Sequence, residues 1–183
     1  MSKVFFFSDL HLGHDKCMKV FDKRPFTSID EQDKEIIKRW NKKVSKEDTV
    51  YIIGDLSWYN DEKTAELLKQ LNGKIILIKG NHDKIGSKTR QYISSILDYK
   101  ELEVNGKKVC LSHYPMLFYN GQYRGAIMLY GHVHNNKDAD ICKEFIKILN
   151  ERGVPCFAYN VGCMFLNFEP CTLEEIEEIY KNL

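Results

Sequence analysis

Residues 4–14 read Val-Phe-Phe-Phe-Ser-Asp-Leu-His-Leu-Gly-His, an apolar run that ends in one carboxylate and two imidazoles. The run predicts a short buried strand at residues 3–8. Ionisable groups at the tip of a buried strand are costly unless they are paired or bound to a metal. Side chains two residues apart on extended backbone point to the same side, so Asp9 and His11 can hold one ion while Leu10 packs behind them. We therefore predict that Asp9 and His11 are metal ligands.

The bulk composition fits one ordinary globular domain over residues 1–183, with 43% hydrophobic and 29% charged residues. The net charge of +1 gives no overall basic field that would favour nucleic acid. No apolar run is long enough to span a bilayer, and the run at residues 4–7 is too short for a signal peptide. We therefore expect a cytoplasmic location and no membrane partner. The six cysteines contain no C-x-x-C pair and are predicted to be free thiols.

Short apolar runs alternate with amphipathic segments, which favours an α/β fold. Strands are expected at residues 3–8, 49–54, 74–79, 100–104, 107–112, 126–131 and 156–161, with Asn105-Gly106 as a hairpin turn. Helices are expected behind Ser28 with Glu31 as its capping-box partner, at 61–71 behind Asn60, at 88–97, at 138–151, and from Thr172 to residue 182.

Four further polar stretches directly follow expected strands. They are Gly54-Asp55, Gly80-Asn81-His82-Asp83, Ser112-His113 and Gly131-His132-Val133-His134. Ligands of layered α/β folds bind at the ends of strands, so these side chains are expected to meet Asp9 and His11 at one place. Gly131 lets the backbone approach that place closely.

The combined side chains have the chemistry of a two-metal site. Asp55 has two carboxylate oxygens and is the natural bridge between two ions, Asn81 offers an amide oxygen, and His113, His132 and His134 offer imidazoles. Mixed imidazole and carboxylate ligands suit Mn, Fe, Zn, Co or Ni better than Ca. Two divalent ions about 3.5–4 Å apart bind an attacking hydroxide and a phosphoryl oxygen together, and their residual positive charge attracts a phosphate.

This ordered set of motifs, which spans residues 9–134, resembles the calcineurin-like metallophosphoesterase superfamily. The resemblance implies an α/β (α+β) fold, a four-layer αββα sandwich of two mixed β-sheets flanked by helices. It also implies two divalent transition-metal ions, with manganese favoured and Fe, Ni, Co or Zn as alternatives. One ion would take Asp9, His11, Asp55 and His134, and the other would take Asp55, Asn81, His113 and His132.

The resemblance also implies a reaction. The expected activity is that of a metal-dependent phosphoesterase in which a hydroxide held by the two ions attacks phosphorus. Its catalytic residues would be Asp55, His82 and Asp83, with His82 over the site assisting the leaving group and Asp83 orienting it. The expected substrate is a small phosphorylated molecule, with a nucleotide as the leading candidate and a phosphodiesterase favoured over a phosphatase.

The chain departs from the protein Ser/Thr phosphatases of this superfamily. Those enzymes carry an acidic residue and an Arg soon after Gly-Asp, and Glu after Asn-His, where this chain has Gly-Asp-Leu-Ser-Trp-Tyr-Asn at residues 54–60 and Gly-Asn-His-Asp at residues 80–83. The chain therefore resembles the small, single-domain bacterial and phage-type members.

Four residues are candidates for substrate binding. Tyr123 and Arg124 lie in the aromatic-rich segment 114–125, which we interpret either as a wall that stacks a base and pairs with a phosphate, or as a loop packed onto the core. Arg24 and His14 are candidates for substrate contact, with a solvated loop position as the alternative for each. For His14 a place behind the metal ligands, without contact to the metal, is a third interpretation.

Two other functions remain as alternatives. A nuclease acting on short nucleic acid would show strong salt dependence of binding. A non-catalytic scaffold built on the same fold would need ligands to be lost, whereas both carboxylates and His82 are present here. The sequence leaves open the natural substrate, the native metal, the oligomeric state and the choice between diester and monoester.

Overall fold

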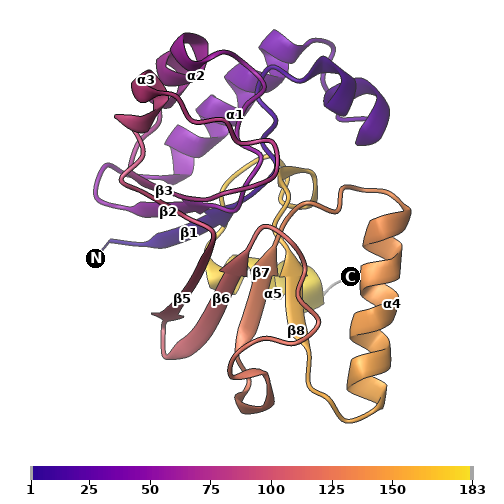
Figure 1. Cartoon of the computed structure of the whole chain (residues 1–183). Helices are drawn as coiled ribbons and strands as arrows, with labels where there is room; N and C mark the ends of the chain where they lie inside the picture. The colour runs from indigo at the N-terminus through magenta and orange to yellow at the C-terminus, as the bar shows by residue number, and fades with distance from the viewer. Residues whose placement is uncertain (1, 182–183) are drawn as a thin grey trace.

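The computed structural model describes residues 2–181 and contains two four-stranded β-sheets, with helices packed on them (Figure 1). The first sheet has the order β1-β2-β3-β4, with β1 Val4–Phe7, β2 Thr49–Ile52, β3 Lys74–Ile78 and β4 Ser95–Leu97. The second has the order β5-β6-β7-β8, with β5 Tyr99–Val104, β6 Lys107–Ser112, β7 Ile127–Tyr130 and β8 Phe157–Asn160. This arrangement confirms the predicted two-sheet α/β sandwich. Only the second sheet is mixed, because all pairs of the first are parallel while β5 and β6 are antiparallel.

Helices α1, α2 and α3 lie over the first sheet, and α4 runs along the second (Figure 1). Their bounds are α1 Ile29–Lys43, α2 Asp61–Leu68, α3 Ser87–Arg90, α4 Lys137–Glu151 and α5 Leu173–Lys181. Three short helical turns complete the chain, η1 Cys17–Phe21, η2 Gln122–Arg124 and η3 Cys163–Phe165. The predicted caps are present, since the side chains of Ser28 and Asn60 accept hydrogen bonds from the backbone N–H groups of Glu31 and Lys63.

The second sheet lies between two apolar clusters, because successive side chains along its strands point to opposite faces. Val109 and Leu111 of β6 belong to the large core shared with the first sheet, whereas Cys110 between them faces the smaller cluster under α4. In β7, Leu129 and Met128 divide in the same way. The period of two is the expected consequence of pleated backbone, and it gives this sheet two covered faces.

The sequence prediction fails at residues 88–97, which were expected to form a helix. Only Ser87–Arg90 is helical, and Ser95–Leu97 is the edge strand β4, paired in parallel with β3. The apolar spacing of Ile93, Ile96 and Leu97 fits a helix, but pairing with an existing strand overrides a weak local preference. The hairpin turn at Asn105-Gly106 is confirmed, with φ of 50° and 77° at the two residues.

The two sheets place their polar strand ends at one edge. Parallel β1, β2 and β3 end beside each other, and parallel β6 and β7 end on the facing sheet. Within the first sheet the N–H of Asp9 donates to the carbonyl of Gly54, and within the second the N–H of Gly131 donates to the carbonyl of His113, both at 3.0 Å. Across the sheets the N–H of His132 donates to Oδ2 of Asp9 at 3.1 Å.

Two sequence expectations concern the whole chain. All six cysteines are free, as predicted, and five of them are buried. Within residues 2–181, no helix combines the length and the apolar character needed to cross a bilayer.

Candidate metal centre

The backbone after β1 brings Asp9 and His11 together in a way that differs from the expected strand alternation. β1 ends at Phe7, and Asp9 and His11 both have positive φ, 54° and 47°. Leu10 is fully buried behind them, as expected. Asp55 and His132 also have positive φ, 53° and 68°. Such backbone costs about 1–3 kcal/mol per residue and is typical of functional sites, where the surrounding structure enforces it.

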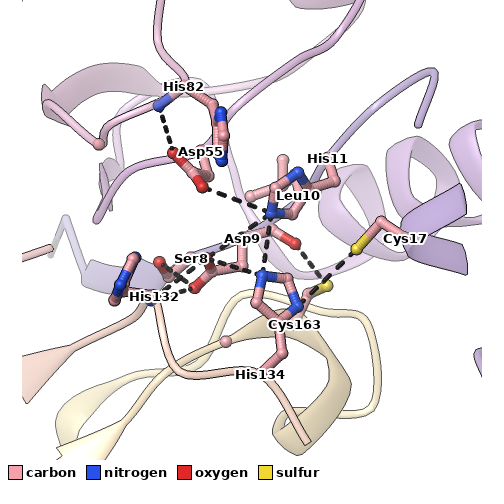
Figure 2. A network of polar contacts seen from close by, with 12 residues as sticks. Ser8, Asp9, Leu10, His11, Cys17, Asp55, His82, His132, His134 and Cys163 are labelled. Atoms are coloured by element: carbon pink, nitrogen blue, oxygen red, sulfur yellow. Dashed lines mark hydrogen bonds and ion pairs between the residues drawn. The ribbon is translucent and has the colours of Figure 1, made fainter. Parts of the chain in front are cut away.

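The first group of converging ligand atoms comes from Asp9, His11 and His134, together with one oxygen of Asp55 (Figure 2). Nε2 of His11 lies 3.1 Å from Nε2 of His134 and 3.5 Å from Oδ2 of Asp55. Oδ1 of Asp9 lies 3.8 Å from the His11 nitrogen and 3.7 Å from the His134 nitrogen. Four ligand atoms therefore face one another around a small space, which is the arrangement that a single metal ion requires.

The second group uses the other oxygen of Asp55. Oδ1 of Asp55 lies 3.6 Å from Nε2 of His113. Oδ1 of Asn81 lies 3.0 Å from that nitrogen and 3.1 Å from Nδ1 of His132. The two oxygens of Asp55 thus belong to different groups, so this carboxylate has the position of a bridge.

The protonation states suit metal binding. Burial, followed by the positive field of His134, lowers the pKa of His11 to about 2, so its imidazole is neutral. Nδ1 of His113 donates to the carbonyl of Ile53 at 2.9 Å, which leaves Nε2 with a free lone pair. Imidazole nitrogens with carboxylate and amide oxygens form a donor set that fits divalent transition-metal ions. The seven side chains predicted as ligands are therefore brought together.

Two glycines make this convergence possible. A Cβ on Gly131 would collide with the Ser8 hydroxyl and with Oδ2 of Asp9, and one on Gly54 would collide with the His113 ring. Gly54 also has a φ of +88°. The close approach expected at Gly131 is confirmed, and any side chain at either position would displace a candidate ligand.

An outer layer holds His134 in place, and the sequence analysis missed it. Asp22 accepts a hydrogen bond from Nδ1 of His134 at 2.9 Å, which directs Nε2 toward the first group. Burial alone would lower the pKa of His134 and raise that of Asp22. The hydrogen bond to Asp22 and the negative charges of Asp9 and Asp22 outweigh burial and the Arg24 cation, so the pKa of His134 is raised. The same hydrogen bond and the Arg24 cation outweigh burial at Asp22 and lower its pKa to about 2. A carboxylate behind a ligating histidine is a common device, but its place in the sequence follows no fixed spacing.

Arg24 is not free to bind substrate, which corrects the sequence hypothesis. Its side chain is fully buried, pairs with Asp22 at 2.8 Å, and donates to the carbonyls of Asp9 and Leu10 at 2.9 and 2.8 Å. The guanidinium therefore supports the strained loop that carries the first two ligands. A buried cation with these partners has no donor left in a direction that a phosphate can reach.

We expect Asp22→Asn to weaken metal binding by about 10–100-fold, the usual cost of losing an outer-layer partner of a ligating histidine. The change removes the charge that fixes the His134 ring and leaves the Arg24 cation unpaired. Titration of metal-free protein with Mn²⁺ or Zn²⁺ against a chromophoric chelator measures the effect. Asp15→Asn is the matched control, because Asp15 is exposed and forms an ion pair with the exposed Lys19, away from the candidate ligands. Equal affinity in the two variants would contradict the assigned role.

His82 and Asp83 follow the candidate ligand Asn81, but they do not form the expected pair. The backbone N–H of His82 donates to Oδ1 of Asp55 at 3.1 Å, and its exposed ring lies near Asp55 and His11 (Figure 2). Both oxygens of Asp83 instead accept backbone N–H groups, from Asp55 and Leu56 at 3.0 and 2.9 Å and from Gly80 at 2.8 Å. Asp83 therefore ties the two ligand loops together, and its expected role in orienting His82 is wrong.

Tyr123 and Arg124, two other candidates for substrate binding, lie far from the candidate ligands. Tyr123 and Arg124 lie in η2, before β7 begins, so they sit at the opposite end of the second sheet from the candidate ligands. Gly121 in the same turn packs on Lys108, near the start of β6. Lys108 and His113 are five residues apart along β6, roughly 16 Å at the rise of a strand. This placement contradicts substrate binding by Tyr123 and Arg124 at this site.

His14 lies beside the centre, behind one of the candidate ligands. Its Nδ1 is 3.3 Å from Nδ1 of His11, and its ring is stacked on Trp58 with centroids 4.0 Å apart and planes at 9°. His14 thus occupies the place where a ligating histidine normally finds its outer partner. Trp58 also lines a cleft of about 200 Å³ with Ser57, Tyr59, Asn81, His82 and Lys84.

Comparison with known proteins agrees with this geometry. Residues 2–159 match the family model of the calcineurin-like phosphoesterase superfamily domain. An uncharacterized protein of Methanocaldococcus jannaschii is 35% identical over 181 residues, which is 98% of this chain and 92% of the relative. The Gene 66 protein of Mycobacterium phage D29 is 32% identical over 163 residues, covering 74% of this chain and 80% of the relative. A protein of unknown function from Aquifex aeolicus has a crystal structure that superposes with a TM-score of 0.75 at 26% identity, covering 98% of this chain and 100% of that chain.

Proposed function

Because this chain belongs to the calcineurin-like phosphoesterase superfamily, we propose that it is a dinuclear metal-dependent phosphodiesterase that acts on a small nucleotide-like substrate. The observation that carries the proposal is the position of Asp55. Its two oxygens lie 3.5 Å from Nε2 of His11 and 3.6 Å from Nε2 of His113, in two separate groups of ligand atoms. Superfamily membership implies divalent metal ions, and these two groups would hold them.

Each side chain has a defined task in this proposal. Asp9, His11, Asp55 and His134 would hold one ion, and Asp55, Asn81, His113 and His132 the other. The bound ions would supply Lewis acidity toward the phosphoryl oxygens and a water of lowered pKa. The protonated ring of His82 would give a proton to the leaving oxygen as the bond between phosphorus and that oxygen breaks, and the ring would be left as neutral imidazole.

The charges around the cleft support a diester as substrate. A diester carries one negative charge, whereas a monoester carries up to two and is commonly held by arginine forks. Arg24 is buried behind the loop and Arg124 lies at the far end of the sheet. Among the residues that line the cleft beside His82, Lys84 is the only lysine or arginine. A singly charged phosphate fits this supply of positive charge better than a dianion does.

An exposed aromatic ring supports a nucleotide. Tyr114 is half exposed and its ring lies 4.6 Å from that of His132, at 62°. A base stacked on Tyr114 would place its phosphate beside the second group of ligands. Of the aromatic segment 114–125, Tyr114 is thus the residue that we assign to substrate.

The test is to reload metal-stripped protein separately with Mn, Fe, Ni, Co, Zn and Mg and to assay two matched esters. We expect bis-p-nitrophenyl phosphate to be hydrolysed only by protein that holds two ions per chain, and p-nitrophenyl phosphate to be a poorer substrate. Cyclic and linear nucleotides are then compared at the best metal. Equal turnover with and without metal would refute the dinuclear mechanism, and turnover of the monoester alone would refute the diester preference.

A further inference from the structure

The orientation of the His82 ring needs a cause other than a polar partner. Its backbone N–H is fixed on Asp55, but within residues 2–181 the ring itself makes no hydrogen bond and no ion pair. Asp83, the next residue, is fully engaged with backbone N–H groups. A proton donor on an exposed loop works only when it is held within reach of the leaving oxygen.

Trp58 is the ring that lies closest to His82. The two centroids are 4.4 Å apart and the planes are tilted by 55°, whereas the His11 ring is 6.2 Å away. Offset or tilted packing at this distance is the favourable geometry of aromatic pairs. The contact places an indole directly beside the imidazole that we assign as the proton donor.

Trp58 is itself held from two directions. Its backbone N–H donates to the carbonyl of Leu12 at 2.8 Å, where a β-bridge joins Leu12 to Ser57. Its indole stacks on His14, whose Nδ1 lies 3.3 Å from Nδ1 of His11. The indole thus connects the loop that carries the first ligands with the loop that carries His82.

We propose that Trp58 is a positioning residue that sets the orientation of His82 over the metal centre, backed by His14. The inference rests on the proposed proton-donor role of His82. Trp58 is 46% exposed beside an open cleft, which would also suit stacking of a substrate base. However, the indole has His14 stacked on it and His82 tilted against it, so its ring neighbours are side chains of the protein itself.

The first arm of the test needs no activity. Metal-free protein labelled at its histidine rings is examined by NMR, with the His82 signal assigned by its absence from His82→Asn. We expect nuclear Overhauser contacts between the His82 ring and the Trp58 indole, and a marked shift of the His82 ring protons in Trp58→Leu. Absence of these contacts would overturn the inference, whatever the enzyme hydrolyses.

The second arm is a double-mutant cycle on the metal-loaded enzyme with Trp58→Leu, His82→Asn and both together. On a diester with an alkyl alcohol as leaving group, we expect Trp58→Leu to lower kcat about tenfold or more, a part of the roughly 10²–10⁴-fold that a general acid contributes. On bis-p-nitrophenyl phosphate the loss should be about twofold or less, since that leaving group needs no proton. In the His82→Asn background, Trp58→Leu should then cost almost nothing further.

The outcomes separate the two claims. If Trp58→Leu raises KM for both esters equally, with or without His82, then Trp58 binds substrate directly and the positioning role is overturned. If His82→Asn itself has no dependence on the leaving group, the proton-donor role fails and the inference fails with it. Trp58→Phe keeps an aromatic ring and should restore most of kcat. Tyr123→Leu is the control, because it removes an exposed ring at the far end of the sheet.

Discussion

Asp55→Asn is expected to lower kcat/KM by roughly a thousandfold or more, because loss of about 4 kcal/mol of transition-state stabilisation corresponds to three orders of magnitude. The same change should reduce the bound metal from two ions per chain to one or fewer. Asp55 has one carboxylate oxygen within 3.6 Å of a candidate ligand nitrogen in each of the two groups, Oδ2 beside His11 and Oδ1 beside His113.

The physical reason lies in the two oxygens of Asp55. Oδ2 faces His11 and Oδ1 faces His113, and the side chain is almost fully buried. Asparagine keeps the shape but has one oxygen, so its amide NH₂ would point a donor at one of the two ions. It would also remove one negative charge from the site that we propose holds two divalent cations.

The measurement combines metal analysis with kinetics on bis-p-nitrophenyl phosphate, and circular dichroism verifies folding. Asp98→Asn is a suitable control, since it makes the same chemical change at an exposed residue between β4 and β5. Two ions per chain in Asp55→Asn, with activity close to that of the native chain, would show that Asp55 is not a bridge.

His82→Asn should separate substrates by their leaving groups. We expect a loss of about 10²–10⁴-fold in kcat for a diester with an alkyl alcohol as leaving group, the usual contribution of a general acid. For bis-p-nitrophenyl phosphate we expect less than about tenfold, because p-nitrophenolate departs without a proton. Metal content should be unchanged, since only the backbone N–H of His82 touches a candidate ligand.

Lys84→Gln is the matched comparison for His82→Asn. Lys84 lines the same cleft and carries a charge, but it has no place in the proton transfer. We expect it to raise KM for both esters by the same factor. If His82→Asn also changed the kinetics of the two esters by the same factor, His82 would be a binding residue and not a proton donor.

Much of the centre was predictable because its ligands share a structural position. Asp9, Asp55 and Asn81 each follow a strand of one parallel sheet, and His113 and His132 follow parallel strands of the other. Residues at the carboxyl ends of parallel strands lie at the same edge of a sheet. The position of each motif directly after an expected strand was therefore sufficient to predict that these ligands meet. The local path was less predictable, because Asp9 and His11 converge through left-handed backbone and not through a strand.

The outer layer was not predictable, because its contacts join segments by packing alone. Asp22 reaches His134 across 112 residues, and Arg24 reaches the carbonyls of Asp9 and Leu10 from a loop that looks solvated in the sequence. The sequence does not distinguish a buried arginine from an exposed one, whereas burial decides which partners the guanidinium binds. The same holds for Asp83, whose neighbour His82 is adjacent in sequence but not a partner.

The sequence by itself determined the alternation of strands and helices, the caps, the hairpin turn and the seven candidate ligands, because these depend on local chemistry and on strand order. The tertiary structure alone decided that Ser95–Leu97 is a strand, that Tyr123 and Arg124 lie at the far end of the sheet, and that the Trp58 indole packs against both His14 and His82. These outcomes depend on which surfaces meet when the two sheets pack. The free energy of that packing is spread over many contacts between distant residues, and no short motif records it.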